Sequence, residues 1–335
     1  IIMRVFNLTN VLAGAMTLSS LGLFAQVDLQ PKLQNYRALG YDGLNVFETK
    51  KDTSKFDGMK VRLGGDFAIQ YQGLSHTNDM DNMAPLGMNV NLPTANLNID
   101  VQLAEGMRMH LRTYLSTRHH NETWVKGGYL QIDNLNFVKQ GFLNGVMDMT
   151  TIRVGVDQIN YGDAQFRRSD NAMAMYNPFV GNYLMDAFTT EPFMEVNVMP
   201  GDFIVVGGIS NGLLNPTVAT AKTGYGSNQM TGTKENKVTF YGKLGWDSQV
   251  NNDLRVRLTG SVYSAAGYDN GDHLYNGDRA GSRYYNIFNS VNSDSTVNSS
   301  GDFSGRFNPG FKNNLSFQIN PFVKFKGFEF FGVFE

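Results

Sequence analysis

Arginine side chains recur at alternate positions in two stretches of this sequence, among residues that switch between polar and apolar. Arg108 and Arg112 are four residues apart, and Arg255 and Arg257 are two apart. Residues two or four apart in a β-strand lie on the same face, so each pair would form a short ladder of positive charge. A guanidinium group presents five N–H donors that match carboxylate and phosphate oxygens. Such ladders are typical of a surface that attracts small anions.

The polar faces of the predicted strands carry more bases than acids, although the whole chain has a net charge of −2. The eleven bases are Lys60, Arg62, Arg108, Arg112, Arg118, Arg153, Lys237, Lys243, Arg255, Arg257 and Lys324, and the six acids are Asp66, Asp100, Asp133, Asp157, Glu195 and Asp247. We expect seven of these bases to line a channel and interact with anions: Arg62, Arg108, Arg112, Arg153, Lys243, Arg255 and Arg257. The same side chains could instead pair with neighbouring acids and stiffen the wall, and the sequence alone leaves both interpretations open.

Catalytic and metal-binding chemistry finds weak support in the sequence. Adjacent side chains of a strand point to opposite faces, so His119 and His120 are not expected to hold one metal ion. His110 is flanked by two arginines, and such cations would not activate it as a base. The Asp-rich runs 79–82 and 269–272 could bind calcium loosely, but solvated turns explain them better. We therefore predict no enzyme activity, no metal and no cofactor.

The elements that must position these side chains are strands with one apolar and one polar face. Residues 57–72 place Val, Leu, Phe, Ile and Tyr at odd positions and mostly charged or amide residues at even ones. This alternation predicts a β-strand, and it recurs down the chain. We expect eleven strands, near 58–72, 96–103, 107–115, 124–134, 149–158, 188–199, 203–210, 237–246, 254–263, 315–325 and 328–335.

The connections between these strands alternate in length. Turns such as Glu105-Gly106 and Pro200-Gly201 need two residues, whereas the connection after the fifth strand spans 159–187. In an antiparallel sheet this pattern puts short turns on one rim and long loops on the other, as in outer-membrane barrels. Strands of roughly 9 to 12 residues also match a tilted crossing of the bilayer and exceed what a soluble sandwich needs. The fold class predicted is all-β, a transmembrane antiparallel β-barrel. Because bacterial barrels have even strand counts, the odd count of eleven predicts a C-terminally truncated fragment.

Composition and the first residues indicate the compartment. The 335 residues include no cysteine, and a net charge near zero gives no field that would attract nucleic acid. Met3, Arg4, the apolar run 11–18 and a stretch ending at Ala25 predict a secretory signal peptide over 1–25. We interpret residues 26–57 as a periplasmic lead-in, too short for the plug of a gated receptor, and residues 58–335 as the incomplete barrel domain.

Two blocks of the sequence carry a resemblance to a known family. Residues 114–133 read YLSTRHHNETWVKGGYLQID, and residues 159–191 include INYGDAQFRRSDN, YNPFVGN and MDAFTTE. Both are similar to the large outer-membrane porins of Bacteroidetes, which are related in architecture to the phosphate-selective porin O/P group. The likeness runs from the signal peptide to residue 335, but the chain lacks the final strands and the terminal aromatic signal of such porins.

The resemblance implies a barrel of about 16 strands, assembled as a homotrimer in the outer membrane of a Gram-negative bacterium and in contact with lipid and lipopolysaccharide. It implies passive diffusion of small hydrophilic solutes, to which the lumen bases add an anion preference. It also implies that the connection 159–187 folds inward as a constriction, with five charged residues that an ordinary surface loop would explain equally well: Asp163, Arg167, Arg168, Asp170 and Asp186. The rival interpretation is a surface-exposed adhesin or binding protein on a barrel or β-sandwich.

Overall fold

The computed structural model describes most of the predicted barrel domain and the segment that precedes it. The described residues are 30–75, 77, 79, 87–116, 120–167, 175–176, 189–214, 220–222, 230–232, 237–267, 274–275, 288–303 and 311–335. The predicted signal peptide 1–25 lies outside them, as do Arg168, Asp170 and Asp186 of the predicted constriction, His119 and most of the two Asp-rich runs.

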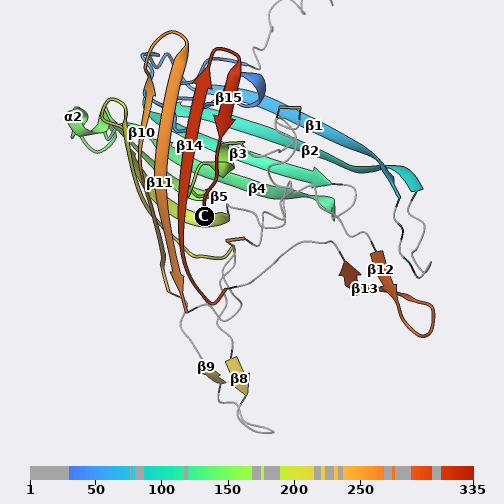
Figure 1. Cartoon of the computed structure of the whole chain (residues 1–335). Coiled ribbons are helices and arrows are strands. Elements are labelled where there is room, and N and C mark those ends of the chain that lie inside the picture. Colours follow the sequence, from blue (N-terminus) through green and yellow to red (C-terminus); the bar gives the residue numbers. More distant parts are fainter. Residues whose placement is uncertain are drawn as a thin grey trace, which may run out of the picture.

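Eleven strands form one antiparallel sheet in which every strand pairs with its neighbours along the chain (Figure 1). The strands are β1 (Lys60–Leu74), β2 (Gly87–Ala104), β3 (Met107–Ser116), β4 (His120–Ile132), β5 (Thr150–Gln158), β6 (Thr190–Val198), β7 (Phe203–Ser210), β10 (Thr239–Gln249), β11 (Leu254–Ala266), β14 (Asn313–Phe325) and β15 (Phe328–Phe331). Each corresponds to one of the eleven segments predicted from alternation, so the all-β antiparallel prediction is confirmed.

The sheet curves strongly, so that one face is concave. Figure 1 shows β1 to β4 running across the back of the view while β10, β11 and β14 stand upright in front of them. The right-handed twist between neighbouring strands accumulates over eleven strands and produces such a change of direction. The strand order ends at β1 on one side and β15 on the other, and no described residue pairs these two strands with each other.

Short and long connections lie on opposite rims. In Figure 1 the turns that join β10 to β11 and β14 to β15 are at the top, and the connections from β7 to β10 and from β11 to β14 begin at the other ends of the strands. Two of these connections contain hairpins, β8 (Thr220–Lys222) with β9 (Met230–Gly232) and β12 (Phe288–Val291) with β13 (Val297–Phe303). Both regions lie between the predicted strand segments, because strands of three to seven residues in polar sequence give no clear alternation.

Helices are few and short among the described residues. They are η1 (Gly40–Gly43), α2 (Asn144–Met147) and η2 (Ala164–Arg167). None of the described helices has the length and apolar character that a membrane-spanning helix needs.

Side-chain burial in the sheet is the reverse of that in a soluble protein. In β2, Asn98 and Asp100 are buried, whereas Leu97 beside them is 48 % exposed. In β14, Gln318 is fully buried and its neighbour Phe317 is 61 % exposed. Since successive residues of a strand point to opposite faces, the polar side chains gather on the concave face and the apolar ones on the convex face.

Two segments outside the sheet cover part of the concave face. Residues 30–57 lie along it, where Gln34 bonds Gln102 of β2 and the ring of Phe47 packs 5.2 Å from that of Phe322 of β14. Residues 159–167 lie beside them, and Phe166 contacts Phe47 with ring centroids 5.8 Å apart. The interior of the curve is therefore occupied by the chain itself as well as by the polar side chains of the strands.

A small apolar cluster adds to this interior beside β6, β7, β10 and β11. It is formed by Ile159, Tyr161, Phe193, Ile204, Val206, Leu213, Tyr241, Tyr263, Ala265, Leu274 and Tyr275. Burial of its Ile, Val, Leu and Phe side chains stabilises the fold by about 1.5–3 kcal/mol each. The cluster anchors the start of the 159–167 segment and thereby positions the polar residues that follow.

Candidate functional site

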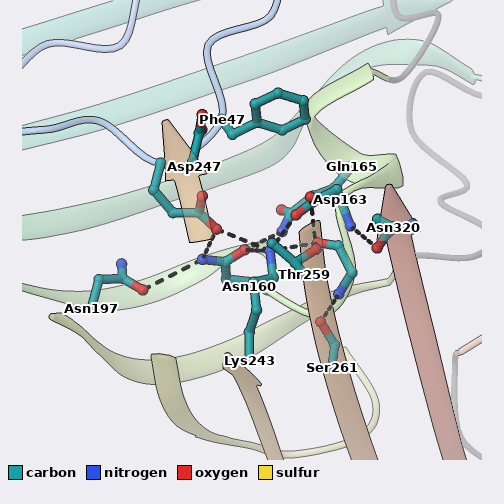
Figure 2. Close-up of polar contacts among 12 residues, drawn as sticks. Phe47, Asn160, Asp163, Gln165, Asn197, Lys243, Asp247, Thr259, Ser261 and Asn320 are labelled. Atoms are coloured by element: carbon teal, nitrogen blue, oxygen red, sulfur yellow. Dashed lines mark hydrogen bonds and ion pairs between the residues drawn. The ribbon is translucent and has the colours of Figure 1, made fainter. Parts of the chain in front are cut away.

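The carboxylate of Asp163 lies at the centre of a buried polar network on the concave face (Figure 2). It accepts hydrogen bonds from Arg257 Nε and Nη2, both at 2.8 Å, and from Lys243 Nζ at 2.8 Å. Thr259 Oγ1 donates to it at 2.9 Å. Its backbone N–H donates to Asn320 Oδ1 at 2.9 Å. Asp163 is thus bonded to β10, β11 and β14 at once.

Glu48, from the segment 30–57, is the second acid of this network. Its Oε1 lies 3.0 Å from Lys243 Nζ, and its Oε2 lies 2.8 Å from Arg257 Nη2. A further carboxylate, that of Asp247, is 3.1 Å from Arg257 Nη1. The guanidinium carbon of Arg257 also lies 4.2 Å from the centre of the Phe47 ring. Both buried bases therefore have their charges offset by acids in direct contact.

Local sequence explains how these groups meet. Lys243 lies four residues from Asp247 on β10, and Asp247 pairs with Arg257 of β11. Residues two or four apart on a strand share a face, as do residues paired across strands, so Lys243 and Arg257 both point inward. The turn before Asp163 requires Gly162, whose φ of +63° is a left-handed conformation. A Cβ at this position would overlap the side chain of Gln318. The Gly162 carbonyl also accepts a hydrogen bond of 2.7 Å from Lys243 Nζ.

Three other predicted channel-lining residues are bonded to acids on neighbouring strands. Arg153 Nε donates to Glu195 at 2.8 Å. Arg108 Nη1 donates to Asp100 at 2.7 Å. The guanidinium of Arg255 makes two bonds to Asp247, at 2.8 and 2.7 Å. Together with Lys243 and Arg257, five of the seven predicted bases thus contact carboxylates.

Arg62 and Arg112 make hydrogen bonds to neutral acceptors. Arg62 Nη1 donates to the backbone carbonyls of Gln30 and Pro31, at 3.0 and 3.3 Å, and its guanidinium lies over the Tyr36 ring. Arg112 Nε donates to Asn98 Oδ1 at 2.9 Å.

Of the predicted constriction residues, Asp163 and Arg167 lie within the described part of the chain. Asp163 sits in the network above, and Arg167 forms an ion pair with Glu329 of β15. The first part of the 159–187 connection is therefore folded against the inner face. The expected constriction also involves Arg168, Asp170 and Asp186, which lie outside the described residues. That acids and bases face each other across a narrow opening therefore stays a prediction.

The comparisons with known proteins give no family. No protein-family model, no curated protein and no solved structure matches this chain.

Sequence reasoning missed the contribution of residues 30–57. Phe47 and Glu48 sit in the middle of the network, but the stretch around them has no alternation and reads as a linker. The signal available was composition, since the segment contains several apolar residues, of which Leu33 and Phe47 are buried. Such a composition predicts that these side chains are buried, but it does not predict which residues they contact.

The titration of Glu48 reflects its surroundings. Burial alone would raise the pKa of its carboxyl, but the charges of Lys243 and Arg257 outweigh burial and hold the pKa well below its usual range. A depressed pKa in the folded state means that Glu48 stabilises the fold above the unfolded value of 4.5. This stabilisation is lost as the pH falls through the folded value.

We therefore expect the variant Glu48→Gln to be less sensitive to acid than the wild type. Urea midpoints measured at about pH 6 and about pH 3 should differ more for the wild type than for the variant. Asp42→Asn is the matched control, because Asp42 is an exposed acid of the same segment. Equal acid sensitivity of wild type and Glu48→Gln would contradict the assigned role of Glu48.

Proposed function

We propose that this protein is an outer-membrane porin of a Gram-negative bacterium, which forms a water-filled channel for passive diffusion of small hydrophilic solutes. The observation that carries the proposal is the reversed burial of the sheet, with buried polar residues on the concave face and exposed apolar residues on the convex face. An outer-membrane barrel has this distribution, because lipid surrounds it and water fills it.

The exposed apolar face is too extensive for a soluble monomer. The side chains exposed on it include Val61, Phe67, Leu97, Met194, Val205, Phe240, Leu244, Leu258, Phe317 and Ile319. Soluble proteins rarely expose apolar patches larger than a few hundred Å². In a β-sandwich a second sheet would cover this face, and the described residues contain no such sheet. Lipid is the environment that such a surface fits best.

The proposal includes closure of the sheet into a barrel and assembly as a homotrimer, as the resemblance implies. An open sheet edge leaves backbone N–H and C=O groups without partners, which lipid does not tolerate. Closure would pair these groups. The residues that cover the concave face would then narrow the channel without any separate plug domain.

A modest preference for anions is also part of the proposal. The ion pairs described above neutralise five of the seven predicted bases. Arg62 is different, because its bonded partners are carbonyl oxygens that carry no net charge. A positive group of this kind at the wall favours anions, most visibly at low ionic strength.

Planar-bilayer recording of the full-length protein tests the channel. We expect discrete conductance steps, and in asymmetric salt a reversal potential of the sign that anion flow produces. The rival adhesin interpretation draws support from the two hairpins on the long-loop rim, β8–β9 and β12–β13. A protein that inserts into the bilayer without any conductance step would favour the adhesin and overturn the channel.

A further inference from the structure

The connection between β4 and β5, residues 133–149, differs from the other connections on the short-turn rim. Because the strands of the sheet are antiparallel and follow chain order, this connection lies at the same rim as the turns 105–106, 199–202, 250–253 and 326–327. Those turns have two to four residues, whereas residues 133–149 include the helix α2. Figure 1 shows α2 projecting beyond the strands on the left of the view. We call residues 133–149 the rim loop.

The rim loop exposes a group of large apolar side chains. Five of them are each between 40 % and 61 % exposed: Phe137, Val138, Phe142, Leu143 and Val146. The exposed charged residues of the rim loop are Lys139 and Asp148. Solvated turns are usually built from Gly, Pro, Asn, Asp and Ser, so this apolar group needs a further explanation.

Hydrogen bonds hold these side chains in a defined arrangement. Within the rim loop, the Phe142 N–H donates to the Lys139 carbonyl at 2.9 Å, and the Met147 N–H donates to the Leu143 carbonyl at 2.8 Å. Thr150 Oγ1, at the start of β5, donates to a carbonyl of the rim loop at 2.8 Å. Since these backbone groups are already paired, moving the rim loop out of water costs less than moving an open turn.

The rim loop lies at the edge of the apolar convex face. The carbonyl of Met149, its last residue, accepts a hydrogen bond of 2.8 Å from the N–H of Met199, which directly follows β6. Exposed apolar side chains of the convex face begin close by, at Val154 of β5 and Val196 of β6. The apolar surface of the rim loop therefore continues the surface for which lipid is the proposed environment.

A bilayer fits this surface better than a second copy of the chain does. Five side chains that are about half exposed present roughly 500 Å², whereas each partner of a stable protein interface buries about 800 Å². The exposed Lys139, between Val138 and Phe142, adds a positive charge. A lysine can keep its stem among apolar groups while its ammonium reaches the phosphates of a lipid surface.

We propose that the rim loop is an anchor at the membrane interface. Its exposed apolar side chains insert among the lipid chains just below the head groups, and Lys139 contacts the phosphates. This inference rests on the proposed function, because it assumes that the convex face lies in a bilayer. It goes further in assigning to one connection a contact with the lipid head-group region that the short turns do not make.

Fluorescence quenching by brominated lipid tests the anchor. The full-length protein carries Trp124→Phe and Trp246→Phe, which remove both native tryptophans, and is folded into vesicles of phosphatidylcholine with bromine on its acyl chains. A single tryptophan is then introduced as Phe142→Trp in the rim loop. We expect its emission to be quenched, and more strongly by bromine close to the head group than by bromine near the end of the chain.

Two further single-tryptophan variants are the matched controls. Leu244→Trp, at an exposed position in the middle of β10, should be quenched more strongly by bromine near the end of the chain. Tyr41→Trp, at an exposed position of the segment that covers the concave face, should not be quenched. Urea midpoints of the three variants check that each has folded.

The combination of results separates this inference from the proposed function. Quenching of Leu244→Trp without quenching of Phe142→Trp would overturn the anchor, since water or another protein would then cover the rim loop, and would leave the channel standing. Quenching of Phe142→Trp alone would support the anchor and reject a lipid-facing convex face. Absence of quenching at both positions would reject the anchor and the membrane location together.

Discussion

Replacing Asp163 by asparagine is expected to lower the free energy of unfolding by about 3–5 kcal/mol. The carboxylate of Asp163 touches Lys243 and Arg257, both buried, and asparagine has no charge to offset theirs. Breaking a buried ion pair by removing one partner costs this much because the other charge is left in a low-dielectric interior. Urea titration followed by the fluorescence of the two tryptophans measures the change.

The exposed pair between Lys50 and Asp202 provides the matched control for Asp163→Asn. Its side chains are 58 % and 44 % exposed, with a separation of 3.2 Å. Exposed ion pairs contribute about 0–1 kcal/mol, so Asp202→Asn should change stability by no more than that. The double variant Asp163→Asn with Lys243→Met leaves Arg257 with Glu48 and Asp247 as its partners, and it should recover part of the loss. A fully stable Asp163→Asn variant would mean that water reaches this network freely.

Replacing Leu244 by arginine is expected to destabilise the membrane-inserted protein by about 2–4 kcal/mol, the cost of an arginine near the bilayer midplane on the lipid face of a barrel. Leu244 stands at the middle of β10 and is 66 % exposed, between Val205 of β7 and Gly260 of β11. In a soluble protein the same change at an exposed site would stay within about 0.5 kcal/mol. The measurement is the urea midpoint of the protein folded into lipid vesicles.

Val250→Arg is the control for Leu244→Arg. Val250 is 52 % exposed but follows the last residue of β10, at the turn on the short-loop rim. An arginine near the membrane interface costs about 0–1 kcal/mol. Equal tolerance of both substitutions would contradict a lipid-facing convex surface and would favour a soluble protein.

The strands could be predicted from the sequence because alternation is a local property of each segment. In β2 and β14 every second residue lies on the same face of the sheet, and this holds whichever strand is the partner. The ion pairs across hairpins were also within reach. Arg108 and Asp100 are eight residues apart on strands joined by a tight turn, and so are Arg255 and Asp247. The register of the hairpin follows from its turn, and register decides which side chains meet.

The network around Asp163 could not be predicted in this way. Arg257 lies 94 residues from Asp163, and Lys243 lies 195 residues from Glu48. Neither Asp163 nor Glu48 belongs to a strand, so no periodic pattern fixes the direction of its side chain. Contacts of this kind depend on where a connecting segment settles after the sheet has formed, and that depends on the shape of the whole concave face.

The position of residues 30–57 in the structure determines when this segment folds relative to the strands. This segment is synthesised before all of the strands, yet Glu48 binds Lys243, Arg255 donates to the Asn45 carbonyl, and Asn45 donates to Glu329, 284 residues further along the chain. Contacts between such distant residues form slowly, because a long loop must close before any of them contributes. A segment that is synthesised before the strands is therefore among the last to reach its final position.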